Sequence, residues 1–260
     1  MIVREHPTAY VMIEQAEHAY MSGQMVSLWK NSLFLGKTYR PSVEYAIEKH
    51  DDGWKAIDQQ PFWNDEKQVP YSFIDFPTIP KTIFYKHGID EVERVDAYSG
   101  LLCSRHYVRF LKGNPSDEVK NFLQQETKRQ QQIVEAIPSF NHEWFDFHYG
   151  LLQFCDDLSL YVCMHEPGAS QTEIHHFFRD GITLHPSLDM FKRHRLTLHW
   201  KDEQTIVIDA FPFKQPVQLT IPQKIVQKDD IAKHGLVKAY ENTPTQYMQV
   251  TLRSTSAIGE

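Results

Sequence analysis

The chain has 260 residues, of which 41% are hydrophobic and 13% are aromatic, enough apolar material for a well-filled core. This composition excludes an intrinsically disordered protein. The formal net charge of −7 argues against a protein that wraps a nucleic acid polymer or lies on an anionic membrane, because both rely on a surplus of lysine and arginine.

The first part of the chain shows the spacing of helices. Residues 10–13 are apolar and predict either a short strand or the start of a helix. Over residues 14–31, apolar and small side chains recur at three- and four-residue steps, which predicts a helix. A second helix is expected over residues 41–49, since proline favours the first helical turn, and it should end before Gly53.

Residues 54–80 hold four prolines among several aromatic side chains. This stretch is too interrupted for a regular element and too aromatic for a free linker, so it predicts an ordered loop packed over the helices. Its aromatic residues are candidates for a lid over a binding site: Trp54, Trp63, Tyr71 and Phe73.

Helical patterning resumes over residues 81–87, 98–111, 116–137 and 142–164. The last of these segments is the most apolar, yet it contains Asp156 and Asp157. An ionised carboxylate in such surroundings costs several kcal/mol unless it is paired, protonated or bound to a cation. The segment therefore predicts a partner for one of these aspartates.

After about residue 186 the pattern changes to alternating or β-branched runs, at residues 195–200, 205–211, 217–221 and 247–252. They predict an antiparallel sheet of three or four strands. The expected fold is thus mainly α, with a helical domain over residues 1–186 and a β-rich C-terminal region, residues 187–260, packed on it.

The cysteines Cys103, Cys155 and Cys163 lie in apolar runs without a Cys-x-x-Cys spacing, so they are expected to be buried, reduced thiols. Near the start, Arg4 and Glu5 stand where a signal peptide needs apolar residues, and no apolar run reaches the ~18 residues of a membrane span. These features predict a cytoplasmic protein.

Five side chains on predicted helices have the chemistry of metal ligands: His18, His50, Asp51, His106 and Asp156. Imidazole nitrogen and carboxylate oxygen together suit borderline divalent metals. One bound ion would account for all of them at once, so the sequence predicts a metal centre within the helical part.

Ordinary explanations exist for each candidate taken alone. The chain has 14 histidines, so several must be simple core or surface residues. The adjacent His50 and Asp51 could form the last turn of a helix, where the helix dipole favours histidine. Asp156 could instead form a buried ion pair with Arg105 or Arg109.

The order of the candidates resembles the HD-domain superfamily of metal-dependent phosphohydrolases. His18 resembles the first histidine of that motif, His50 and Asp51 resemble the central doublet, and Asp156 resembles the late aspartate, here in Cys-Asp-Asp-Leu-Ser at residues 155–159. His106 matches the place where some members carry an additional histidine, which would allow a second metal.

Residues 15–19, 50–54 and 155–160 are also similar to an uncharacterised bacterial family of unknown function, over nearly the full length. Asp157 stays open as an alternative ligand to Asp156. The β-rich tail departs from the superfamily's core fold, and packing, lidding and dimerisation are the roles open for it.

The resemblance implies a helical HD-like bundle that binds one or two divalent ions, with Mn, Fe, Ni, Zn and Mg all open. It implies hydrolysis of a small phosphate ester, a nucleotide or a sugar phosphate, by water that the metal activates. Asp51 and His106 would take part in catalysis, and Arg105, Arg109 and Lys55 would bind the phosphate.

Two other functions stay open: a di-iron oxygenase on the same scaffold, and a non-catalytic binding or interaction protein that keeps the fold. The expected partner is a small phosphorylated substrate, without nucleic acid polymer or membrane, and a homodimer is also open.

Overall fold

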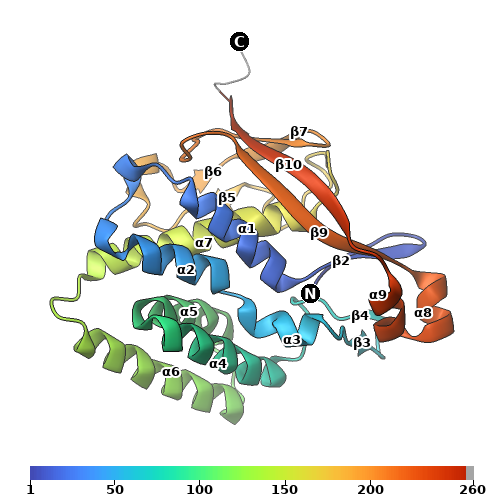
Figure 1. Ribbon diagram of the computed structural model, residues 1–260, viewed down its shortest axis with the longest axis horizontal. Coiled ribbons are helices and arrows are strands. Elements are labelled where there is room, and N and C mark those ends of the chain that lie inside the picture. The colour runs from blue at the N-terminus through green and yellow to red at the C-terminus, as the bar shows by residue number, and fades with distance from the viewer. Residues whose placement is uncertain (256–260) are drawn as a thin grey trace.

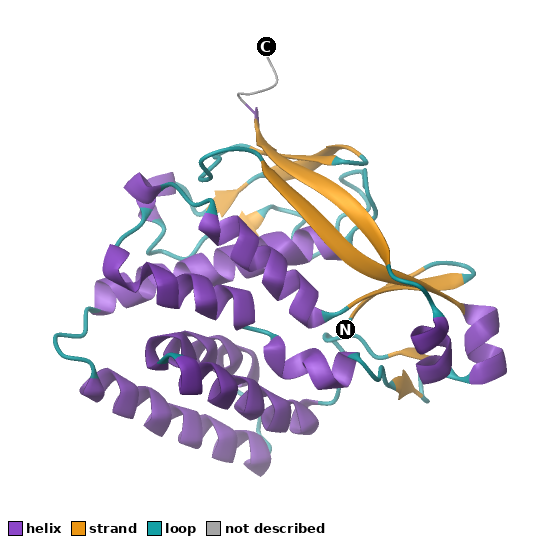
Figure 2. Cartoon of the chain, viewed as in Figure 1, coloured by secondary structure: helices purple, strands orange, loops and turns teal. Residues whose placement is uncertain are grey.

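A six-stranded sheet lies along one side of a stack of helices in the computed structural model, which describes residues 1–255 (Figure 1, Figure 2). The strand order is β1 (Ile2–Glu5), β2 (Ala9–Ile13), β9 (Val217–Gln227), β10 (Gln246–Ser254), β8 (Thr205–Ile208) and β7 (Leu198–Asp202). Neighbouring strands are antiparallel, except that β10 and β8 run parallel.

The predicted mainly α fold, an HD-domain-like helical bundle with a C-terminal antiparallel sheet as an appendage, is wrong. The first strands of the chain belong to the same large sheet as the last ones, because β2 pairs with β9 and places Tyr10 opposite Val226. The sheet has six strands and contains a parallel pair. The protein is therefore a mix of helices and a large sheet that spans much of the chain.

Burial explains why the sequence left β2 open as either a strand or the start of a helix. All five of its residues are buried, so it lacks the alternation of apolar and polar side chains that marks a half-exposed strand. One side of the sheet packs on the main core, and the other packs, through Tyr10, Met12 and Val226, on two short helices, α8 (Lys228–His234) and α9 (Leu236–Asn242).

The longer helices pack beside one another in a stack (Figure 1). They are α1 (Gln15–Ser27), α2 (Arg40–Lys49), α4 (Thr78–Val95), α5 (Ala97–Leu111), α6 (Asp117–Ala136) and α7 (His142–Met164). The helices expected from sequence periodicity occur in these places, and α7 has the expected bounds. Helices α1 and α7 contact strands of the sheet, whereas α4, α5 and α6 lie on the far side of the stack.

The predicted loop over residues 54–80 contains more structure than expected. A 3-10 turn (Asp52–Trp54) leads into the short helix α3 (Lys55–Asp58), and strands β3 (Trp63–Asn64) and β4 (Val69–Pro70) form a small hairpin. A second small pair, β5 (Ile182–Thr183) and β6 (Arg195–Leu196), follows α7. Both segments lie over the helices and supply walls of the site described below.

Two general expectations can be compared with the fold. The three cysteines are buried and free, as the sequence predicted. Among residues 1–255, no helix combines the length and the apolar character needed to cross a membrane.

Candidate metal centre

His18 is placed by the junction between the sheet and the helices. Strand β2 ends at Ile13, and α1 begins at Gln15, so the second turn of α1 lies against α7. The His18 side chain is 0% exposed there. One turn later, the Ser22 hydroxyl lies within hydrogen-bond distance of the His18 and Cys155 carbonyls and of the Ser159 hydroxyl, which ties α1 to α7 at this point.

The doublet His50–Asp51 lies where α2 ends. His50 is the C-cap of α2, and its Nδ1 lies 2.7 Å from the Ile47 carbonyl oxygen, a free acceptor of the last helical turn. Asp51 then begins the 3-10 turn with a change of backbone direction. The helix-terminus explanation of the doublet is thus correct for its backbone, and that geometry turns both side chains inward.

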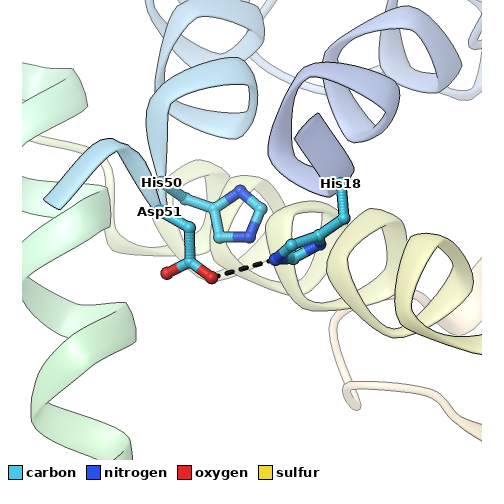
Figure 3. Close-up of side chains that lie close together, drawn as sticks. All are labelled: His18, His50 and Asp51. Atoms are coloured by element: carbon cyan, nitrogen blue, oxygen red, sulfur yellow. Dashed lines mark hydrogen bonds and ion pairs between the residues drawn. The ribbon is translucent and has the colours of Figure 1, made fainter. Parts of the chain in front are cut away.

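Two further helices complete the cluster. His106 from α5 is 1% exposed and Asp156 from α7 is 2% exposed. The His50 ring lies between the other two imidazoles, with ring centroids 5.1 Å from His18 and 5.0 Å from His106, both in edge contact. Figure 3 shows the first part of this cluster, with His18 and Asp51 joined and the His50 ring beside them.

The five predicted ligands form two overlapping triads. One is His18, His50 and Asp51, and the other is His50, His106 and Asp156; within each, one ligand atom per residue lies within 4.8 Å of the others. All five side chains are buried. These buried His and Asp groups could therefore hold a metal ion, with His50 common to both triads.

Hydrogen bonds show which ring nitrogen of His18 faces the carboxylate of Asp51. The Ser159 hydroxyl donates to the Asp156 carbonyl at 2.8 Å, so its oxygen accepts from Nδ1 of His18 at 2.9 Å. Nε2 of a neutral His18 then carries a lone pair, and it lies 2.9 Å from Oδ2 of Asp51. Two lone pairs at that distance repel, so this geometry calls for a cation between them, either a second ring proton or a metal ion.

Buried nitrogen atoms without partners test whether a metal would fit. Nε2 of His50 and Nδ1 of His106 are buried and make no hydrogen bond with any residue that the structure describes. His50 Nε2 faces Oδ1 of Asp156 at 3.4 Å. Since a buried polar atom without a partner costs free energy, the donor set of imidazole nitrogens and carboxylate oxygens fits a divalent ion.

The pKa values of the two histidines in the second triad, His50 and His106, shift in opposite directions. Burial works to lower the pKa of His50, but the carboxylates of Asp156 and Asp51 outweigh it and raise the pKa to about 9. Burial lowers the pKa of His106 to about 3, because Asp156 compensates less there. His106 is accordingly a neutral imidazole at physiological pH, the form that binds metals.

The aspartates respond in opposite directions. Burial works to raise the pKa of Asp156, but the neighbouring histidines hold it below its ordinary value, and His18 and His50 do the same for Asp51. Asp157 lacks such partners, so burial and the charge of Asp156 raise its pKa to about 7. Of the two adjacent aspartates, Asp156 is the one that joins the triad.

Three residues of the cluster, Asp51, His106 and Asp156, line a pocket of about 370 Å³, whereas His18 and His50 are not in its lining. Asp51, His106, Asp156 and Asp157 line its acidic end, and Arg109 and Lys81 line it as cations. The remaining wall is mainly apolar and aromatic: Trp54, Phe73, Ile74, Tyr85, Phe110, Leu160, Phe177, Phe178 and Ile182. A pocket of this size and lining suits a small molecule with one charged end and one apolar end.

The predicted cations lie in different places. Arg109 lines the pocket, and its Nη2 is 4.0 Å from Oδ2 of Asp156. Arg105 pairs instead with Asp146 at 3.0 Å and does not line this pocket. Lys55 is exposed at the start of α3 and is also absent from the lining.

Of the aromatic residues proposed as a lid, Trp54 and Phe73 line the pocket. Tyr71 packs on Phe76, and Trp63 packs against the second apolar cluster beyond the sheet.

Sequence reasoning missed two polar residues of the pocket. Lys81 lies in the first turns of α4, where its Nζ donates to the Phe73 carbonyl at 2.7 Å. Gln15 donates its side-chain N–H to Oδ2 of Asp51 at 3.0 Å, the same oxygen that His18 contacts, and so helps to fix that carboxylate. The sequence pattern indicated a helix only from residue 81, whereas α4 begins at Thr78. The side of the helix on which Lys81 lies was therefore not predicted.

A comparison with protein families gives one match, over residues 1–228, to the family described as "Protein of unknown function (DUF3891)". No curated protein and no solved structure matches the chain.

Proposed function

The chain belongs to the DUF3891 family of unknown function, and we propose that it is a metal-dependent hydrolase of small phosphate esters, in keeping with its resemblance to HD-domain phosphohydrolases. The observation that carries this proposal is the pair of buried His/Asp triads, of which Asp51, His106 and Asp156 line a pocket that also contains Arg109 and Lys81. Metal ligands and cations facing one small cavity are the combination that phosphate chemistry needs.

His18, His50, Asp51, His106 and Asp156 would hold the metal, which we expect to be a divalent ion such as Mn, Fe, Ni, Zn or Mg. When bound, such an ion polarises a phosphoryl oxygen and lowers the pKa of water from about 15.7 toward ~7. Gln15 and Ser159 hold Asp51 and His18 in place by hydrogen bonds, so the ligand set is oriented before a substrate arrives.

The rest of the pocket would bind the substrate. Arg109 and Lys81 offer N–H donors to phosphate oxygens, and arginine can bind two oxygens of one phosphate. Phe73, Phe110 and Phe177 lie around the apolar part of the wall, which would receive the organic group of the ester and exclude water.

The di-iron oxygenase alternative uses the same ligands, since carboxylate and imidazole suit iron as well. The two pocket cations favour the hydrolase, because they give a binding site to an anionic phosphate. An absorption band in the near ultraviolet from anaerobically purified protein would favour the oxygenase instead.

The first experiment is elemental analysis of protein purified without an affinity tag, in the wild type and in His50→Ala. We expect a stoichiometric divalent ion in the wild type and its loss in the variant, because His50 belongs to both triads. His87→Ala is the matched control, since His87 is exposed on α4 and should leave the metal content unchanged.

The second experiment measures hydrolysis of p-nitrophenyl phosphate and of small nucleotides and sugar phosphates with added manganese or nickel. We expect activity in the wild type and none in His50→Ala. A protein without stoichiometric metal, whose His50→Ala variant is equally stable, would instead be a non-catalytic binding protein.

A further inference from the structure

A second pocket, of about 580 Å³, lies between α5, α6 and α7, beside the metal pocket. No aspartate or glutamate lines it among the residues that the structure describes. Its lining combines three cations with amide and aromatic side chains: Arg105, Arg109, Lys112, Gln130, Gln131, Gln153, Phe140, Phe145 and Tyr149. In a chain of net charge −7, a pocket lined in this way is suited to an anion.

The cations come from α5 and the residue that follows it. Arg105 and Arg109 are four residues apart on α5, a spacing that aligns side chains along a helix, and Lys112 is the C-cap residue of the same helix. Like charges in such a row repel one another. A bound anion removes this repulsion, so the row itself favours anion binding.

Arg105 packs on two aromatic rings that line the same pocket. Its guanidinium lies 4.6 Å from the centre of the Tyr149 ring and 5.2 Å from that of Phe145. Asp146 is the one carboxylate that pairs with it among residues 1–255, at 3.0 Å, and both side chains are more than a third exposed. An exposed pair of this kind is weak, so Arg105 can still donate to a ligand.

The rest of the lining has a different chemistry. Leu101, Val134 and Phe140 provide apolar contacts, and the amides of Gln130 and Gln131 also line the pocket. An apolar wall with a few amide groups suits the flat ring of a nucleobase, which stacks on aromatic side chains and exchanges hydrogen bonds at its edge. The volume also lies within the range of ~300–1,000 Å³ typical of small-molecule pockets.

We propose that this pocket is a second ligand site that binds a nucleotide, with its phosphates on Arg105, Arg109 and Lys112 and its base against Phe140. The site is distinct from the metal pocket and does not depend on the proposed hydrolase activity. Arg109 lines both pockets, so a nucleotide bound here draws its guanidinium away from Asp156 and changes the charge beside the metal ligands.

The experiment is calorimetric titration of ADP into the full-length protein treated with EDTA, so that no metal contributes to binding. Three variants remove one positive charge each: Lys112→Gln in the second pocket, Lys81→Gln in the metal pocket, and Lys128→Gln on the exposed face of α6. Lys112 and Lys128 are both exposed, so neither substitution threatens the fold.

We expect ADP to bind the wild type, with roughly tenfold weaker binding in Lys112→Gln, as for loss of one charge-assisted hydrogen bond. Lys81→Gln and Lys128→Gln should stay within about twofold of the wild type. Pyrophosphate, which has no base, should bind more weakly than ADP.

Four results would overturn the proposal. ADP would fail to bind the wild type, or Lys112→Gln would bind it as well as the wild type, or Lys81→Gln would weaken it most, which would place ADP in the metal pocket. Equal affinity for ADP and pyrophosphate would remove the base from the assignment and leave a plain phosphate site.

Discussion

Oγ of Ser159 lies 2.9 Å from Nδ1 of His18, and this hydrogen bond turns the other ring nitrogen of His18 toward Asp51. Ser159 is held in turn by its bond to the Asp156 carbonyl, so one hydroxyl connects both ends of the ligand cluster.

Ser159→Ala should therefore weaken metal binding by about 10- to 100-fold while leaving all five ligands in the chain, since partners of this kind fix the tautomer and orientation of a ligating histidine. Competition with a chromogenic chelator measures the affinity. Ser27→Ala, at the exposed end of α1, is the control and should bind metal like the wild type.

The adjacent aspartates should respond differently to loss of charge. Asp156→Asn should abolish stoichiometric metal binding, because Asp156 is the carboxylate of the second triad. Asp157→Asn should retain the metal and be at least as stable at pH 8, since burial and Asp156 disfavour the charged form of Asp157. Elemental analysis and urea unfolding check both. Metal loss in Asp157→Asn alone would reverse the assignment.

The buried side chain of His148 should make the folded protein less stable in acid. It is buried, its Nδ1 lies 2.6 Å from the Tyr98 hydroxyl and its Nε2 lies 2.9 Å from the Leu35 carbonyl oxygen. Burial lowers its pKa to about 4. His148 in the unfolded chain then binds a proton near pH 6.5, whereas in the folded chain it stays neutral until about pH 4. Its contribution to the stability of the fold is therefore present above pH 6.5 and is lost as the pH falls toward 4.

Between pH 7 and pH 4.5 this residue alone should cost the wild type about 2 kcal/mol of unfolding free energy. His148→Gln should lack that part of the pH dependence, although it is less stable at neutral pH. Urea unfolding of both proteins at the two pH values measures how much the unfolding free energy of each one falls. Parallel pH profiles in the two proteins would contradict the prediction.

Gly88 on α4 lies against Gly53, two residues after Asp51 of the first triad. A Cβ at position 88 would come within 2.8 Å of the Gly53 backbone, and a Cβ at position 53 within 2.5 Å of the Phe84 carbonyl oxygen. Gly88→Ala should destabilise the protein by about 1–3 kcal/mol, because backbone has to move. Thermal unfolding with and without metal would report the change, and the exposed neighbour His87→Ala should be nearly neutral.

Residues 1–186 expressed alone should not fold. Strand β2 would lose its partner β9, and the core would lose Leu219, Ile221 and Val226, which are 0% exposed. Circular dichroism and heteronuclear NMR of this fragment test the point. A cooperative, native-like fragment would show that the sheet is dispensable for the helices.

The helices and the metal cluster were predictable because their signals are local. Apolar spacing fixed α7 to its observed bounds, and donor chemistry together with motif order selected the five candidate ligands, which the structure brings together. The sequence left residues 10–13 open between a strand and the start of a helix, because β2 is buried on both faces, one of them covered by α8 and α9 far along the chain.

The cations show a second limit of sequence reasoning. Arg105 and Arg109 share one helical stripe, yet only the latter reaches the metal pocket among the residues described, because the stripe runs from one cavity to the next. Lys55 is near the ligands in sequence but begins α3 with its side chain exposed, whereas Lys81 arrives from a separate helix.

The position of β9 between β2 and β10 also sets an order of events during synthesis. The helix that carries His18 is synthesised well before β9, the strand that pairs with β2 just ahead of that helix. Contacts between such distant segments form late, since the intervening chain must first be closed into a loop. The start of α1, and with it His18, would therefore be anchored only after β9 has been synthesised.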